Sequence, residues 1–191
     1  MKKVLFILAI IIVIVGIFLV LRPRVSASKG ATDGGKILVA YFSATGNTKA
    51  VAEKLADATG ADLFEITPEQ LYTDEDLNWQ NDQSRSSIEM ASKYSRPAIA
   101  SKIENIAQYN VVFVGFPIWW GREPSIIDTF MESYDFAGKI IVPFATSGTS
   151  GIGDSGANMQ SLAPNAHVRG GERFPVDVSV SELKTWADEQ M

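Results

Sequence analysis

The stretch that decides the fold of this 191-residue chain is YFSATGNT, residues 41–48. It follows a nearly continuous apolar run, residues 36–42, which is typical of a strand covered on both faces. It leads into residues 47–59, whose apolar side chains recur at helical spacing and which end at Gly60. We therefore predict that the stretch contains a loop between a buried strand and a helix.

Within that stretch, residues 43–48 gather hydroxyl and amide side chains around one glycine. Backbone N–H groups at the start of a helix, together with such side chains, can surround a phosphate without any basic residue. A helix cap would explain only one of these polar residues, so their number favours phosphate binding. The candidate phosphate-binding residues are Ser43, Ala44, Thr45, Gly46, Asn47 and Thr48.

Two better-known phosphate loops do not fit this stretch. A Walker A loop requires a lysine before its final Ser or Thr, and Asn47 occupies that place. The dinucleotide fingerprint requires three spaced glycines, whereas only Gly46 is present. The loop therefore suits a phosphomonoester.

Outward from the loop, strand and helix patterns alternate along the chain. Strands are predicted over residues 36–42, 61–67, 110–116, 139–145 and 167–174, and helices over 47–59, 124–133, 156–162 and 181–189. A further helix is predicted to begin after Asn81 or Asp82 and to run toward Tyr94. This alternation predicts an α/β domain with a parallel sheet.

In such a sheet, ligands bind beyond the carboxyl ends of the strands. Residues 43–48, 117–121 and 146–151 each follow a predicted strand directly. These three loops are therefore the candidate site.

The three motifs together resemble the flavodoxin family, and the resemblance covers about residues 36–190. It rests on the loop quoted above, on PIWWG at 117–121 and on TSGTSG at 146–151. It implies a flavodoxin-like, doubly wound, five-stranded parallel sheet with helices on both faces. It also implies that FMN is the cofactor and that residues 43–48 hold its phosphate.

The second loop is suited to a flat, electron-poor flavin ring, on which an indole can stack. By the resemblance, Trp120 is the preferred ring contact, with Trp119 close behind, and backbone groups near Gly121 would meet the ring edge. One tryptophan could instead belong to the core while the other contacts a partner. The candidate ring-binding residues of this loop are Pro117, Ile118, Trp119, Trp120 and Gly121.

The third loop departs from the family pattern, because many flavodoxins have an aromatic residue there and this chain has Thr149 and Ser150. Small hydroxyl residues would leave one ring face open to a second substrate. A mobile, glycine-rich turn without contacts is the alternative. The glycine spacing at 148–151 does not match a nucleophile elbow. The candidate cofactor-binding residues of this loop are Thr146, Ser147, Gly148, Thr149, Ser150 and Gly151.

Residues 69–97 are polar and poorly periodic. They are interpreted as a solvated insertion with a local helix. A functional alternative has them lie over the flavin and select the partner. We place none of them in the predicted site.

The N-terminus has its own organisation. Residues 4–21 are 18 consecutive apolar or glycine positions, and at ~1.5 Å per residue a helix of that length spans about 27 Å, close to a bilayer core. Residues 1–25 are therefore predicted to be a transmembrane or signal-anchor segment, residues 26–35 a linker, and residues 36–191 the flavodoxin-like domain. The expected location is the cell membrane, with a single-pass anchor and an extracytoplasmic domain. Cleavage after Ala27 would instead give a secreted protein.

Composition excludes several classes of function. With 22 acidic and 17 basic residues the chain has a net charge of −5, which argues against nucleic-acid binding. The absence of cysteine excludes disulfides, thiolate catalysis and cysteine-ligated iron–sulfur clusters, and one histidine excludes a multi-histidine metal site. No metal and no catalytic residue are predicted.

Three functions remain compatible with the sequence. The first is a membrane-tethered electron carrier that uses FMN and a redox partner protein. The second is an FMN-dependent NAD(P)H:quinone or flavin reductase, whose partners are a small quinone and a nicotinamide. The third is a flavin-free, membrane-tethered binding module. Fold alone does not decide among them.

Overall fold

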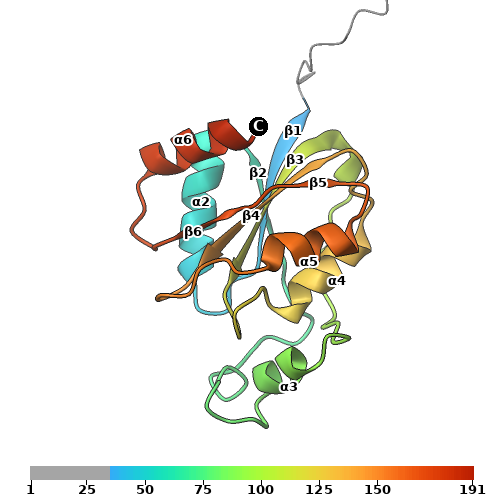
Figure 1. The fold of residues 1–191 in the computed structure, drawn as a ribbon, viewed down its shortest axis with the longest axis vertical. Coiled ribbons are helices and arrows are strands. Elements are labelled where there is room, and N and C mark those ends of the chain that lie inside the picture. Colours follow the sequence, from blue (N-terminus) through green and yellow to red (C-terminus); the bar gives the residue numbers. More distant parts are fainter. Residues whose placement is uncertain (1–34) are drawn as a thin grey trace, which may run out of the picture. The chain divides into compact units, whose positions relative to one another are not determined.

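The sheet is parallel throughout, with strand order β2-β1-β3-β4-β5 and with β6 beside β4 (Figure 1). The computed structural model describes residues 35–191. The strands are β1 (Lys36–Tyr41), β2 (Asp62–Glu65), β3 (Tyr109–Pro117), β4 (Ile140–Thr146), β5 (His167–Val168) and β6 (Glu172–Phe174). The order confirms the predicted doubly wound parallel α/β sheet.

Helices cover both faces of the sheet. The α-helices are α2 (Asn47–Thr59), α3 (Arg85–Ala91), α4 (Ser125–Ser133), α5 (Ser155–Leu162) and α6 (Val180–Gln190), and a 3-10 turn, η1, spans Ile106–Gln108. Figure 1 shows α2 and α6 on one side of the sheet and α4 and α5 on the other. No helix within residues 35–191 is long and apolar enough to cross a membrane, and the predicted anchor, residues 4–21, lies outside the described residues.

The two faces follow the two-residue period of the strands. Along β1, Leu38 and Ala40 belong to the cluster that packs against α4, while Val39 and Tyr41 belong to the cluster that packs against α2 and α6. The sheet therefore has two apolar faces, as its nearly continuous apolar strands predict.

The predicted fifth strand, residues 167–174, is broken into β5 and β6, which both pair with β4. Pro143 of β4 lies opposite the break. The Arg169 N–H donates to the carbonyl of Ile141 in β4. The next ladder bond would be donated by the backbone nitrogen of residue 143 in β4, but Pro143 has no N–H. Gly171, at φ 76°, passes so close that an added Cβ would lie 2.4 Å from the Pro143 carbonyl oxygen.

The predicted helix beginning after Asn81 or Asp82 and running toward Tyr94 was wrong in its bounds. The helix is α3, which starts later, and the side chain of Ser84 caps it by accepting from the Ser87 N–H. The residues before it form turns, with their own asparagine side chains accepting backbone N–H bonds. Such local bonds compete with helix formation.

A long connection, which we call the insertion, runs from Pro68 to Ile99. An isolated antiparallel bridge joins its two ends, and the Glu69 N–H donates to the Ala98 carbonyl at 2.9 Å. Figure 1 shows the insertion, with α3, extending beyond α4 at one end of the domain.

Candidate functional site

The loop at residues 43–48 ends β1 and starts α2 without a side-chain cap. Gly46 is the N-cap residue, with φ 87°, and no side chain accepts a capping hydrogen bond there. Capping therefore does not account for the polar side chains of this loop. Thr45, Gly46 and Asn47 are exposed, while the hydroxyl oxygen of Ser43 is buried without a hydrogen-bond partner.

Thr146 joins the three loops. Its hydroxyl forms a buried 2.8 Å hydrogen bond with the Thr48 hydroxyl, which ties the third loop to the first. Its carbonyl accepts from the Ile118 N–H at 3.1 Å, which ties the third loop to the second. The structure therefore brings the three predicted loops together at one edge of the sheet.

The second loop is a tight hairpin that the sequence alone did not predict. The Trp119 N–H donates to Arg122 at 2.9 Å and the Arg122 N–H donates back at 3.1 Å. Trp120 and Gly121 form the turn with φ 48° and 82°, as a type I′ turn requires. Trp120 is the sole non-glycine residue with positive φ within residues 35–191.

The two tryptophans differ in their surroundings. Trp120 is 52% exposed, so its indole is available for a ligand. Trp119 is partly buried, and its ring packs edge-on against Phe42 at 5.6 Å and against Tyr72 at 5.3 Å. This favours Trp120 as a ring contact and gives Trp119 a packing role.

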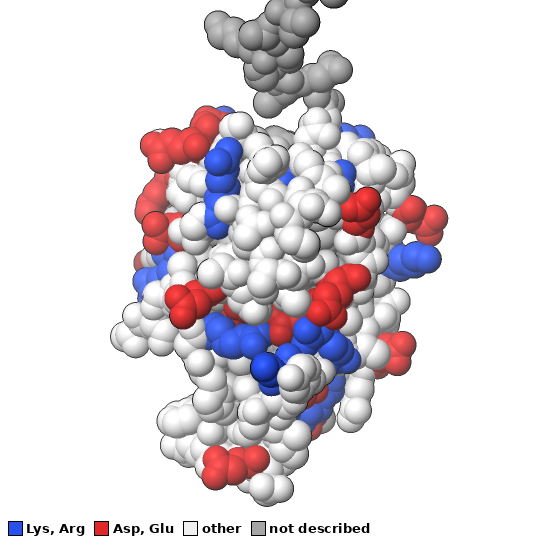
Figure 2. Space-filling model, turned by 45° about the vertical axis from the view of Figure 1, so that its right-hand side comes forward, with Lys and Arg blue, Asp and Glu red and all other residues white. Residues whose placement is uncertain are grey.

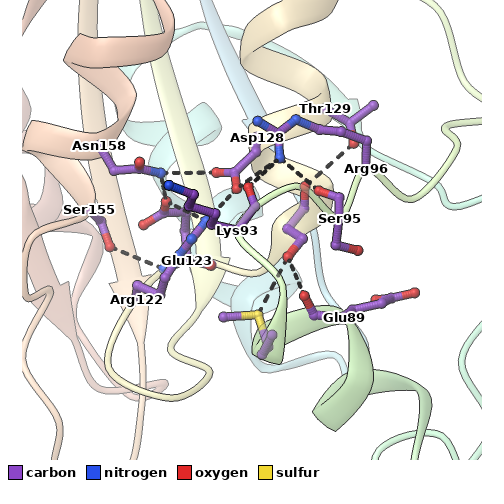
Figure 3. A network of polar contacts seen from close by, with 12 residues as sticks. Glu89, Lys93, Ser95, Arg96, Arg122, Glu123, Asp128, Thr129, Ser155 and Asn158 are labelled. Atoms are coloured by element: carbon purple, nitrogen blue, oxygen red, sulfur yellow. Dashed lines mark hydrogen bonds and ion pairs between the residues drawn. The ribbon is translucent and has the colours of Figure 1, made fainter.

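A polar network holds the hairpin to the two helices beneath it (Figure 3). Arg122 pairs with Glu123 at 3.1 Å and also with Asp128 of α4. From α5, Asn158 donates to both carboxylates, and the Ser155 hydroxyl accepts from the Glu123 N–H at 3.1 Å. These contacts therefore fix the hairpin that carries Trp120 to α4 and α5.

Glu123 is fully buried, and one of its carboxylate oxygens, Oε2, has no hydrogen-bond partner. Burial raises the pKa of this carboxyl above its ordinary value. The nearby Asp128 raises the pKa further, while the neighbouring Ser155 hydroxyl and the Arg122 guanidinium oppose the rise.

In the third loop, residues 148–151 are exposed. Arg173 of β6 donates to the carbonyls of Ser147 and Gly148, each at 2.6 Å. A Cβ added to Gly148 would have nothing within 4 Å. The start of this loop is thus anchored, whereas Thr149 and Ser150 face solvent.

Just beyond it, Gly153 approaches the second loop. A Cβ added there would lie 2.4 Å from the Gly121 carbonyl oxygen, and Gly153 has φ 60°. Only glycine fits such a close backbone approach without strain.

The insertion is mostly exposed and contains a local helix, as predicted, and it also contributes to this edge of the sheet. Tyr72 packs on Phe42 and Trp119 and donates to Glu89 of α3. Burial, followed by that hydrogen bond, raises the pKa of Tyr72. Leu77, Trp79 and Ser86 line a cavity of about 280 Å³ together with Ile118, Trp119 and Trp120.

Comparison with known proteins decides the family. A family model described as flavodoxin matches residues 36–190. The chain belongs to the flavodoxin family. Its flavodoxin domain therefore carries all three loops described above, and the family predicted from their sequence is confirmed.

Two solved structures of this kind come from Bacteroides. A Bacteroides eggerthii protein provisionally described as a flavoprotein is 49% identical, with a TM-score of 0.77, over 82% of this chain and 98% of its own. A similarly described Bacteroides uniformis protein is 45% identical, with a TM-score of 0.77, over 81% of this chain and 99% of its own.

A more distant solved structure shares the fold. A flavoprotein from Lactobacillus acidophilus, solved in complex with FMN, is 23% identical, with a TM-score of 0.60, over 80% of this chain and 99% of its own. No match was found among curated proteins. By family and fold, residues 36–190 form a flavodoxin-like flavin-binding domain.

Proposed function

We propose that this chain is a membrane-tethered FMN protein that carries electrons between redox partners. FMN is the cofactor of the three-loop site, and it supplies chemistry in which electrons are taken up and passed on one or two at a time. The observation that carries the proposal is the joining of the three loops by Thr146. These loops bring a phosphate cradle and an exposed indole to one edge of the sheet.

The residues fit the two ends of FMN. In the first loop, the uncapped start of α2 offers backbone N–H groups, and the unpartnered Ser43 hydroxyl lies in the same loop. A helix start of this kind favours a phosphate group. In the second loop, Trp120 offers an exposed ring on a rigid hairpin. Residues 147–151 would border the ring from the other side.

The first test separates the phosphate from the ring. Residues 28–191 are titrated with FMN and with riboflavin, which lacks the phosphate. The variants are Thr45→Ala and the double variant Thr45→Ala with Thr48→Ala. Each lost hydrogen bond to the charged phosphate is expected to weaken FMN binding about tenfold, whereas riboflavin binding should change little. The single variant is cleaner because Thr48 also bonds to Thr146.

Equal losses for both ligands would show that the loop does not hold the phosphate. A protein that takes up no flavin would remove both redox functions and leave the flavin-free binding module. A carrier is expected to give two resolved one-electron steps in a redox titration, without NADPH oxidation.

The second candidate function is an FMN-dependent NAD(P)H:quinone reductase. It is favoured by the exposed third loop, where the small side chains of Thr149 and Ser150 would leave one face of the ring accessible. NAD(P)H would give two electrons and one proton as a hydride, a second proton would come from water, and the quinone would take up both electrons and both protons. Rapid NADPH-dependent quinone reduction supports this function, and its absence in flavin-loaded protein rejects it.

The proposed location follows from residues 4–21, whose apolar length suits a bilayer. The segment anchors the chain by a single pass, with the flavodoxin domain outside the cytoplasm. Cleavage after Ala27 would release the domain instead.

A further inference from the structure

The cavity between the insertion and the second loop is an open one that residues of both segments line. Leu77, Trp79 and Ser86 come from the insertion. Ile118, Trp119 and Trp120 come from the second loop. Its volume of about 280 Å³ is near the lower limit for pockets that hold small molecules.

The chemistry of the lining is uniform. Three of the six lining residues are tryptophans, two are aliphatic, and none carries a charged side chain. The polar side-chain atoms of the lining are the indole N–H groups, which can donate a hydrogen bond, and the Ser86 hydroxyl, which lies 3.4 Å from the Ser84 hydroxyl. The cavity therefore offers flat apolar surfaces with a few donors.

Two of the lining tryptophans expose a large apolar surface to water, which is unfavourable in free energy. Trp79 is 69% exposed and Trp120 is 52% exposed, although large apolar side chains are usually at least half-buried. Figure 2 shows few charged side chains on the lowest part of the displayed face, the end that the insertion forms in Figure 1. A ligand between these indoles would cover apolar surface that the fold leaves open.

We propose that this cavity binds a neutral, planar molecule with carbonyl acceptors, of the quinone class. Its rings would stack against the indoles, and its carbonyl oxygens would accept from the indole N–H groups. The proposal deepens the reductase function and rests on it for its physiological meaning. Binding itself does not require flavin.

A charged ligand fits less well. A nicotinamide dinucleotide carries phosphates, and desolvating them beside apolar walls is unfavourable without a basic partner. The six lining residues supply none. The cavity therefore selects the electron acceptor rather than the nicotinamide donor.

The test measures binding of 2-methyl-1,4-naphthoquinone by calorimetry. We use residues 28–191, because the described residues 35–191 form one compact unit. The chain has no cysteine, so the quinone finds no thiol to alkylate. Saturable one-site binding is expected, and the 3-sulfonate of the same quinone, which stays planar but carries a charge, should bind at least about tenfold more weakly.

Variants on the insertion locate the site. Trp79→Ala is expected to weaken binding about tenfold, and Trp79→Phe to restore most of it, because a stacking ring returns. The matched control is Ile88→Ala, which changes a 54% exposed apolar residue of the insertion that does not line the cavity. It should leave the affinity unchanged.

Three outcomes would overturn the proposal. They are no saturable binding, equal losses in Trp79→Ala and Ile88→Ala, and competitive displacement of the quinone by FMN, which would make the cavity the place of the flavin ring itself. FMN uptake is followed separately by visible absorbance. Quinone binding without FMN uptake would reject the proposed function and leave the cavity proposal standing.

Discussion

Trp120 occupies a backbone conformation that side chains avoid. A non-glycine residue in the left-handed region costs about 1–2 kcal/mol, and Trp120 has φ 48° with its indole half in solvent. Type I′ turns favour Asn before Gly. A tryptophan at this position therefore does not increase the free energy of unfolding. A role in ligand contact would explain why a tryptophan is present there.

Trp120→Asn tests this directly. Because Asn tolerates the left-handed region, the variant should raise the free energy of unfolding by about 0.5–1 kcal/mol while weakening FMN binding. Urea unfolding of the flavin-free protein and FMN titration measure the two effects. Trp119→Ala is the contrasting variant, and it should cost about 2 kcal/mol because it empties an aromatic cluster. A destabilised Trp120→Asn would mean that Trp120 serves packing.

The residue pattern alone could not separate these two tryptophans, and the resemblance placed Trp120 only slightly ahead of Trp119. Both are aromatic, adjacent and placed after a strand, and either could have faced the core. The difference comes from Tyr72, which packs on Trp119 from the insertion. A contact between residues so far apart in the chain leaves no local pattern. The same reason hid Leu77, Trp79 and Ser86, although a tryptophan at position 79 within a polar segment was a signal that the sequence did offer.

At the scale of elements, the second and third loops are held together at one point. Gly153→Ala should lower the free energy of unfolding by at least about 1 kcal/mol and weaken FMN binding, since a Cβ would collide with the Gly121 carbonyl oxygen. Gly148→Ala is the matched control, because its Cβ meets open space, and it should change stability by less than about 0.5 kcal/mol. Thermal unfolding compares them. Equal stabilities would contradict the close approach.

The network beneath the hairpin predicts a pH dependence. Burial raises the pKa of Glu123 in the folded chain, so the folded state binds that proton more tightly than the unfolded state. The resulting stability is present below the ordinary pKa of 4.5 and is lost as the pH rises through the raised pKa. Glu123→Gln should therefore gain stability relative to the unaltered chain as pH rises above 4.5, by at most about 1.4 kcal/mol per pH unit.

Glu132→Gln provides the opposite control. A hydrogen bond from Arg96 lowers the pKa of Glu132, so its contribution is lost as the pH falls. This variant should lose stability relative to the unaltered chain as the pH rises through the acid range. Urea unfolding between pH 4 and pH 7 distinguishes the two slopes, and parallel slopes would reject the assignment to Glu123.

Regular elements with strong periodicity were predictable. The helix over 47–59 has the predicted bounds because its apolar spacing and Gly60 mark it clearly. The helix α3 did not, because seven residues carry too few repeats to define a period. The break in the fifth strand also escaped prediction, since it depends on Pro143 in the neighbouring strand.

At the scale of the whole molecule, the order of strands and loops was readable from the sequence, whereas membrane attachment stays a prediction. The full chain is expected to sediment with membranes, and residues 28–191 to remain in the supernatant. In intact cells, external protease should digest the flavodoxin domain if it lies outside the cytoplasm. Protection in intact cells together with digestion after lysis would place the domain inside.

The interrupted fifth strand has a consequence for how the molecule behaves at high concentration. An open sheet normally presents two margins on which another chain can add a strand. Here one margin is divided into pieces of two and three residues, too short to template a partner. At the other margin, the acidic residues of β2 pair with lysines of β1 and α2, Lys36 with Asp62 at 3.2 Å and Lys49 with Glu65 at 3.4 Å. Both margins therefore disfavour self-association into β-aggregates.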